Sequence, residues 1–138
     1  MRNAFAIAVA AALACSFATP AGAQERGRVT VSLYRAAPGH QIELLKWIAE
    51  QDRIAAAAGI GAGQLYAHTD GDSWDYVVIY PQTTPAQDGA IDAAAKKMGM
   101  PSGPMVAIEL RKHIAVHTDT LARGPMTAAQ MLADLGQK

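Results

Sequence analysis

The stretch RVTVSLYR, residues 28–35, alternates strictly between apolar and hydroxyl-bearing or charged side chains. Successive residues of an extended strand point to opposite faces. Val29, Val31 and Leu33 would therefore share one side of a strand, and Pro38 follows soon after and breaks the pattern. The stretch predicts a β-strand with one strongly apolar face.

Residues 40–58 predict a helix that ends at Gly59. Charges of alternating sign recur along it every three or four residues, as on a solvated helix face. Asp52 falls on the opposite, apolar side, while Trp47 and Ile54 lie near the charged side, where a monomer would expose them. Those two are either a further contact surface or ordinary exposed residues. The expected core residues are Leu44, Leu45, Ile48 and Ala55.

The glycine-rich segment GIGAG, residues 59–63, precedes two predicted strands at 64–70 and 75–80. No Lys-Ser or Lys-Thr pair follows these glycines and no helix comes next, so the segment is not a phosphate-binding loop. Residues 71–73 have the composition of a tight turn, which predicts a hairpin between the two strands.

The second half begins with an alanine-rich predicted helix over residues 85–98. Residues 105–115 have apolar spacing close to that of a helix but also alternate; we favour a helix, and a strand is the alternative. Residues 117–123 predict the last strand. Thr127 can then cap a short final helix that runs to Leu135.

The predicted order is β-α-β-β-α-β, with the second helix broken or doubled and a short C-terminal helix added. This is the ferredoxin-like plan of the α+β class, an antiparallel sheet with its helices on one face. The helix side is expected to take Val29, Val31, Leu33, Leu65, Ala67, Val77 and Ile79. The other side is expected to take Thr30, Ser32, Tyr34, Tyr66, His68, Tyr76, Val78 and Tyr80.

This element order and these two kinds of sheet face resemble the dimeric α/β-barrel superfamily of ferredoxin-like domains, over about residues 28–123, at the level of its small exported members. The resemblance implies a homodimer in which two sheets face each other and enclose a pocket. Members include cofactor-independent monooxygenases, haem-degrading and haem-binding proteins, and many without a known activity. The Asn, Trp and His set of the haem-degrading members has no match here, so the resemblance implies a fold rather than a reaction.

The first 23 residues have the pattern of a secretory signal peptide. Arg2 precedes an unbroken apolar run over residues 4–18, and Ala-Gly-Ala at 21–23 offers the small side chains that a signal peptidase reads. We expect cleavage before Gln24 and a periplasmic or secreted protein. The run is shorter than the roughly 20 residues of a membrane span, so the membrane is reached only if the signal stays uncleaved.

One domain is expected over residues 28–136. Cys15, the single cysteine of the chain, lies inside the signal, where lipidation is the alternative to simple removal. After cleavage no disulfide can form, so the core and a partner subunit must supply the stability. The 12 basic residues balance the 12 acidic ones and are scattered, which argues against a nucleic-acid partner.

Four tyrosines and a histidine are the candidate pocket residues. If the strand registers hold, Tyr34, Tyr66, Tyr76 and Tyr80 line one sheet face with His68. Aromatic rings with polar tips suit a small aromatic or apolar ligand. They also suit a plain dimer interface.

The tripeptide His-Thr-Asp occurs twice, at residues 68–70 and 117–119. Residues two apart in a strand point to the same side, so each Asp could orient its His as a general base. His68, His117 and Asp119 are therefore the candidate catalytic residues, and chance together with turn chemistry is the alternative.

No cofactor and no resident metal is expected. Glu109, His113 and His117 would line one stripe of a continuous helix, where they could hold a divalent ion, but the predicted helix ends before His117. The function expected is that of an exported, dimeric small-molecule-binding protein. A proton-transfer or cofactor-independent monooxygenase activity and a purely structural dimer are the alternatives.

Overall fold

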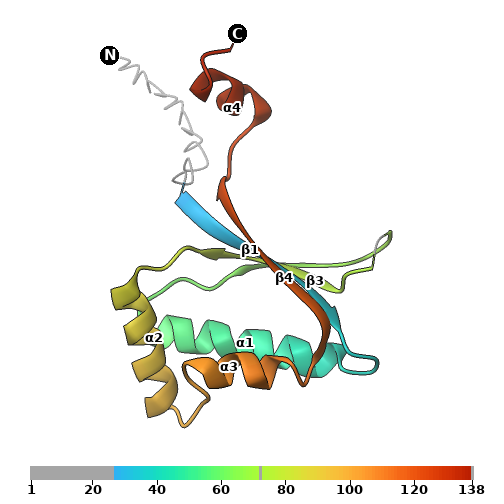
Figure 1. Ribbon diagram of the computed structural model, residues 1–138, viewed down its shortest axis with the longest axis vertical. Coiled ribbons are helices and arrows are strands. Elements are labelled where there is room, and N and C mark those ends of the chain that lie inside the picture. The colour runs from blue at the N-terminus through green and yellow to red at the C-terminus, as the bar shows by residue number, and fades with distance from the viewer. Residues whose placement is uncertain (1–26, 72, 138) are drawn as a thin grey trace, which may run out of the picture.

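The computed structural model describes residues 27–71 and 73–137, so the expected signal peptide lies outside the described residues. This part of the chain forms strands and helices around one sheet (Figure 1). In chain order they are β1 (Gly27–Ala36), α1 (Gln41–Ala57), β2 (Gln64–Ala67), β3 (Tyr76–Pro81), α2 (Pro85–Lys97), α3 (Pro104–Leu110), β4 (Ile114–Gly124) and α4 (Ala128–Asp134).

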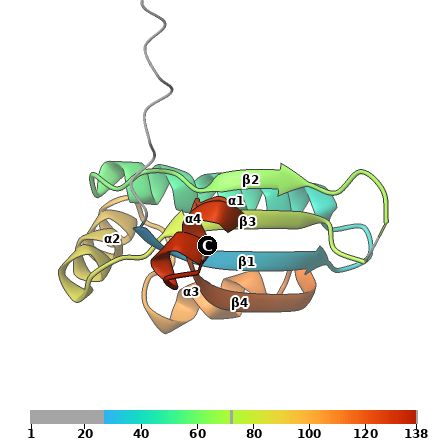
Figure 2. The same cartoon turned by 90° about the horizontal axis from the view of Figure 1, so that it is seen from above.

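The four strands form one antiparallel sheet in the order β2-β3-β1-β4. Helices α1, α2 and α3 cover one face of this sheet, whereas α4 stands on the opposite side (Figures 1 and 2). The protein therefore has a ferredoxin-like α+β fold. The connection between β3 and β4 contains two helices, α2 and α3, and α4 follows β4. The protein therefore has more helices than the expected β-α-β-β-α-β order.

On β1 and β3, the sheet face that meets the helices is the reverse of the one expected. Tyr34 is only 3% exposed and Val78 is fully buried, and both belong to the core with Leu44 and Ile48 of α1. Leu33, on the other face of β1, is exposed. The alternation of β1 was identified correctly, but a period of two does not say which set of side chains faces the helices.

Strand β2 has the expected orientation, with Leu65 and Ala67 toward the helices and Tyr66 away from them, but it is shifted by one residue relative to the expected faces of β3. Tyr66 pairs with Val77, and Leu65 pairs with Val78. Tyr66 therefore shares the open face with Val77, while Leu65 shares the helix-covered face with Val78. A one-residue slip in register turns every side chain of a strand to the other face.

Helix α1 buries a wider stripe than its charge pattern indicated. Leu44 and Ile48 are buried as expected, but Ile54 is 1% exposed and Trp47 is half-buried, whereas Leu45 is exposed. The helix packs against α2 as well as against the sheet, so its apolar surface extends toward the charged side. Trp47 and Ile54 are therefore packing residues of the monomer rather than a separate contact surface.

The ambiguous segment 105–115 contains both alternatives in succession. It is helical up to Leu110 and becomes β4 at Ile114. The final helix is confirmed, because the Thr127 side chain accepts from the backbone of Gln130, whose side chain accepts in return from Thr127 N–H. Among the described residues, none of the helices combines the length and the apolar character needed to cross a membrane.

Candidate functional site

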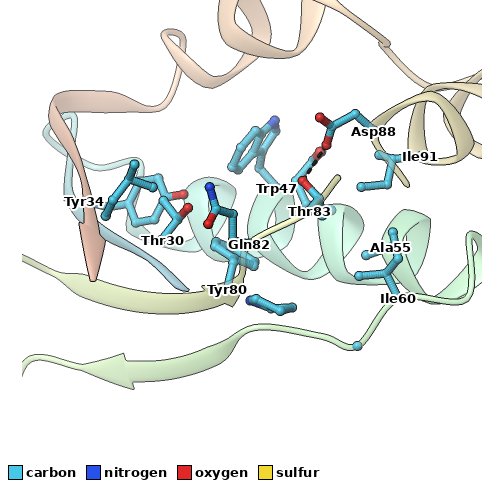
Figure 3. Close-up of a pocket in the computed structure, with 14 residues that line it drawn as sticks. Thr30, Tyr34, Trp47, Ala55, Ile60, Tyr80, Gln82, Thr83, Asp88 and Ile91 are labelled. Atoms are coloured by element: carbon cyan, nitrogen blue, oxygen red, sulfur yellow. Dashed lines mark hydrogen bonds between the residues drawn. The ribbon is translucent and has the colours of Figure 1, made fainter. Parts of the chain in front are cut away.

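A cavity of about 490 Å³ lies between the sheet and the α1–α2 layer (Figure 3). Strand side chains form its floor, α1 forms one wall, and the start of α2 and the loop before β2 close its far end. The lining residues are Thr30, Tyr34, Trp47, Gln51, Ala55, Ile60, Gly61, Tyr80, Pro81, Gln82, Thr83, Asp88, Ile91 and Leu121.

Aromatic rings form the inner wall of this cavity. The Tyr34 ring stacks on His117 of the neighbouring strand, with centroids 4.7 Å apart and an interplanar angle of 18°. The ring of Trp47 lies 6.5 Å from that of Tyr34, tilted by 60°. Tyr34 and His117 meet because they are directly opposite in the β1–β4 pairing.

A chain of polar groups leads from the cavity to the edge of the sheet. The Tyr34 hydroxyl lies close enough to the side chains of Tyr80 and Ser32 for each of them to influence its pKa. Ser32 Oγ in turn donates to Asp119 Oδ1 over 2.6 Å, and the same carboxylate oxygen lies 3.0 Å from His117 Nε2. Ser32 is buried while Asp119 is exposed, so the chain runs from the protein interior to solvent.

Tyr34, which is buried, and Tyr80, which is half-buried, remain protonated hydrogen-bond donors at neutral pH. Burial raises the pKa of Tyr34 above its usual value, and the nearby Asp119 carboxylate adds to this effect. Burial also raises the pKa of Tyr80, with further contributions from Tyr34 and from Asp52. Removing a phenol from water disfavours its charged form. The cavity floor therefore presents neutral phenols.

The lining of the cavity includes polar groups but no positive charge. Gln51, Gln82 and Thr83 contribute amide and hydroxyl groups, and none of the 14 lining residues is Lys, Arg or His. The one charged group, Asp88, accepts a hydrogen bond from Thr83 Oγ1. An anionic ligand would find no counter-charge among these side chains.

Asp52, which was unexpected on the apolar side of α1, accepts a hydrogen bond from Gly63 N–H over 3.1 Å. This bond fixes the end of the glycine-rich loop against the helix. Position 63 requires a glycine, because a Cβ atom there would lie 2.5 Å from Val78 Cγ1 and 2.6 Å from Tyr80 Cε1. The glycines of residues 59–63 therefore serve a close backbone approach next to the cavity.

The other predicted pocket residues lie elsewhere. Tyr66 is on the open sheet face. Tyr76 packs against the core and donates from its hydroxyl to the Gln41 carbonyl over 3.2 Å. His68 lies beyond the end of β2, 5.0 Å from the Trp74 ring, in a separate cavity that shares no lining residue with the one around Tyr80. The structure thus brings Tyr34, Tyr80, His117 and Asp119 together.

The stripe proposed for a metal ion does not form. Helix α3 ends at Leu110, so Glu109, His113 and His117 do not follow one continuous helix. Glu109 is paired with Lys112, and the ring of His113 lies 5.9 Å from that of His40. Within residues 27–71 and 73–137, no three His, Cys, Asp or Glu side chains gather in an arrangement that could hold a metal ion.

Several cavity residues escaped the sequence analysis. Trp47 had a usable signal, because a tryptophan beside a charged stripe needs an apolar partner. Gln82, Thr83 and Asp88 had none, since they follow a strand or begin a helix in a segment of ordinary polar composition. Their role depends on how α2 packs beside α1, which no local pattern reports.

The fold and this cavity define a ferredoxin-like α+β protein with an internal pocket between sheet and helices. No family model and no curated protein matches the sequence. Solved structures with a similar fold include protein Atu4242 from Agrobacterium tumefaciens (16% identity, TM-score 0.48), with 73% of this chain and 95% of that chain covered.

Two further structures are similar at the level of the fold. One is an uncharacterized NIPSNAP domain protein from Burkholderia xenovorans, with 13% identity, a TM-score of 0.43, and 73% of this chain and 96% of that chain covered. The other is a dimeric ferredoxin-like protein from an uncultured marine organism, with 10% identity, a TM-score of 0.46, and 75% and 91% covered.

Proposed function

We propose that this protein binds a small, flat, uncharged molecule in the cavity between its sheet and its helices. The observation that carries the proposal is the aromatic wall of Tyr34, Trp47 and Tyr80 around a volume of about 490 Å³, within the usual range for small-ligand sites. Flat rings stack favourably on such walls.

The polar groups narrow the class of ligand. Tyr34 and Tyr80 hold their protons, so they can donate hydrogen bonds to a carbonyl or ether oxygen. The lining carries no cation, so burial of an anion would have no compensating charge. A planar ring system with one or two oxygen acceptors fits this environment best.

Calorimetric titration with coumarin and with coumarin-3-carboxylate tests the proposal, because the two probes differ by one negative charge. We expect coumarin to bind and the carboxylate to bind at least tenfold more weakly. A Trp74→Phe variant leaves Trp47 as the single tryptophan reporter, and its fluorescence should change on binding. Absence of coumarin binding up to millimolar concentration would overturn the proposal.

Matched tyrosine variants locate the probe. Tyr80→Phe removes one donor from the cavity and should weaken coumarin binding roughly 5- to 15-fold, the value of about 1–1.5 kcal/mol for a lost hydrogen bond. Tyr66→Phe changes the open face and should leave binding unchanged. Equal effects of the two substitutions would place the probe outside the cavity.

A second candidate function is proton transfer to or from the bound molecule. It is favoured by the hydrogen bond from the buried Ser32 hydroxyl to Asp119, next to Tyr34 and Tyr80, and by His117 beside the same carboxylate. A surface carboxylate and an imidazole connected to a buried hydroxyl can act as a proton reservoir.

Exchange of the α-hydrogens of 2-tetralone, followed by NMR in deuterated buffer, tests this second function. Asp119→Asn and His117→Ala should lower a catalysed exchange rate by roughly 10²–10⁴-fold while binding is largely retained. His68→Ala is the matched control, because His68 lines a different cavity. Exchange at the uncatalysed rate with the unmodified protein would exclude proton transfer on this probe.

We further propose that the protein is exported and works as a homodimer. Export is supported by the sequence of residues 1–23. Intact-mass measurement of the periplasmic or secreted protein should give a chain that starts at Gln24, and a chain that retains Met1 would overturn this. The dimer is supported by the apolar open face of the sheet, which includes Val31, Leu33 and Val77.

A further inference from the structure

The C-terminal helix α4 buries none of its residues against the described part of its own chain. Every residue from Ala128 to Gln137 is exposed. The helix has only seven residues, and isolated helices shorter than about 12–15 residues are marginal in water. It nevertheless carries a complete capping box at Thr127. A short, well-capped helix that is exposed all round needs a surface supplied from elsewhere.

One side of α4 is apolar. Ala128, Met131, Leu132 and Leu135 follow the i, i+3, i+4, i+7 spacing of a core-facing helix stripe. The opposite side is made of smaller or polar residues. Met131, Leu132 and Leu135 are 45%, 48% and 61% exposed. The stripe therefore has the spacing of a buried helix face but is not buried.

The position of α4 points away from its own sheet. The end of β4 carries it out to the side of the open face, where it stands above the strands (Figures 1 and 2). Three residues join β4 to α4, and these span at most about 10 Å. The ion pair between Arg123 and Asp134, 2.6 Å long, also ties the distal end of α4 back to β4.

The open face offers a complementary surface. A groove of about 460 Å³ lies at the end of the open face where β1 begins and β4 ends. It is lined mainly by apolar atoms from the strands and the glycine-rich loop. Val29, Val31, Tyr66, Ile79 and Pro125 are among its lining residues. Methionine and leucine side chains of the kind carried by α4 fit such a groove.

We propose that α4 of one copy docks on the open sheet face of a second copy, so that each protomer clasps the other. This inference rests on the proposed homodimer. When two sheets meet face to face, α4 of each copy, which lies above its own open face, comes to lie next to the partner's sheet. The two helices then exchange symmetrically, as a two-fold interface requires.

The size of the open face supports this occupant. Four strands about 4.8 Å apart give a width of roughly 19 Å. Strands of 4 to 11 residues give a length of roughly 13–36 Å, and hence a face of about 250–700 Å². A standard stable interface takes about 800 Å² per partner. The sheet alone falls short, and an exchanged helix from each copy supplies the missing area.

Sedimentation analysis of the full chain with Met131→Asp and Leu135→Asp tests the proposal. We expect the dimer dissociation constant to rise at least tenfold. Gln137→Glu adds a charge at the same end of the chain without touching the apolar stripe and should leave dimerisation unchanged. If Leu33→Asp abolishes the dimer while the α4 variant does not weaken it, the exchange is wrong and the sheet-to-sheet dimer stands.

A disulfide trap distinguishes exchange from folding back onto the same chain. In a Cys15→Ser background, a chain carrying both Ile79→Cys and Leu132→Cys is oxidised and run on a non-reducing gel. Exchange predicts a product of twice the chain mass, and it also predicts cross-linking between the two single variants when they are mixed. An intrachain disulfide at monomer mass, or no cross-link while the dimer persists, would overturn the proposal.

Discussion

Gly63 is the residue that sets how closely the loop before β2 approaches the cavity. A Cβ atom at this position would lie 2.5 Å from Val78 and 2.6 Å from Tyr80, which is shorter than any real contact. Val78 is fully buried, so it cannot move aside without disturbing the core. The backbone approach and the placement of the Tyr80 ring therefore depend on each other.

Gly63→Ala is expected to lower the free energy of unfolding by about 1–3 kcal/mol, the usual range for overpacking, and to displace the Tyr80 ring. Urea denaturation gives the first effect, and weaker coumarin binding reports the second. Gly61→Ala in the same loop is the control for stability, because a Cβ there meets nothing within 4 Å. Equal stability of the two variants would contradict the close approach.

The buried tyrosines make stability dependent on alkaline pH. The pKa values of Tyr34 and Tyr80 are raised in the folded state above the ordinary value of 10.0, chiefly by burial. Below about pH 10 both states keep these protons, so the two residues add no pH dependence. Above it the unfolded chain loses its protons first, and the free energy of unfolding falls as the pH rises.

The expected slope is about 1.4 kcal/mol per pH unit for each tyrosine that stays protonated in the folded state. Urea denaturation between pH 8 and pH 11 measures it. Tyr34→Phe removes one of the two groups and should make the decline shallower. A decline of unchanged slope in both Tyr34→Phe and Tyr80→Phe would show that other groups cause it.

At the scale of elements, β1 ends in an irregularity that a side chain stabilises. The pairing of β1 with β4 shifts register between Arg35 and Ala36. The Ala36 N–H then donates to Asp75 Oδ2 over 2.7 Å, and the Asp75 N–H donates to the Tyr34 carbonyl over 2.8 Å. Asp75 thus replaces a missing ladder partner beside the core.

Asp75→Ala is expected to cost about 1–3 kcal/mol, because it leaves a buried backbone N–H without a partner. Ala36 is itself a core residue, so water cannot readily take the place of the carboxylate. Thermal or urea unfolding measures the loss. Asp70→Ala, at an exposed position of the same hairpin, should change stability by less than about 0.5 kcal/mol.

Local sequence patterns predicted a strand or helix correctly where a single periodicity extends over the whole element. The alternation of residues 28–35 identified β1, and the Thr127 cap identified α4. Residues 105–115 were ambiguous because the change from α3 to β4 falls inside them. A window that contains the end of a helix and the start of a strand matches neither period cleanly.

Orientation could not be read from the same patterns. Both faces of β1 carry residues suited to burial, with Val29, Val31 and Leu33 on one and Tyr34 on the other. Which face meets the helices depends on how α1 and α2 pack. Tyr34 and Tyr80 were correctly placed on one face of the sheet. Because the helices cover that face, the cavity lies between sheet and helices rather than between two sheets.

At the scale of the whole molecule, the sheet has one covered face and one open face. The open face presents Val31, Leu33, Val77 and Val116 on adjacent strands, and Leu33 and Val116 are exposed there. A contiguous apolar surface of this kind marks an interaction site. The corrected orientation therefore gives the proposed dimer a more apolar interface than the tyrosine face first expected.

The dimer can be tested with two leucines of equal exposure. Leu33 on the open face and Leu45 on α1 are each 36% exposed. Leu33→Asp places a charge in the proposed interface and should convert the protein to a monomer, whereas Leu45→Asp should leave the dimer intact. If folding and association are linked, the Tm of the unmodified protein should rise with its concentration. That rise should vanish in Leu33→Asp and persist in Leu45→Asp. A Tm independent of concentration in all three proteins, together with monomer masses by light scattering, would leave the open face to another partner.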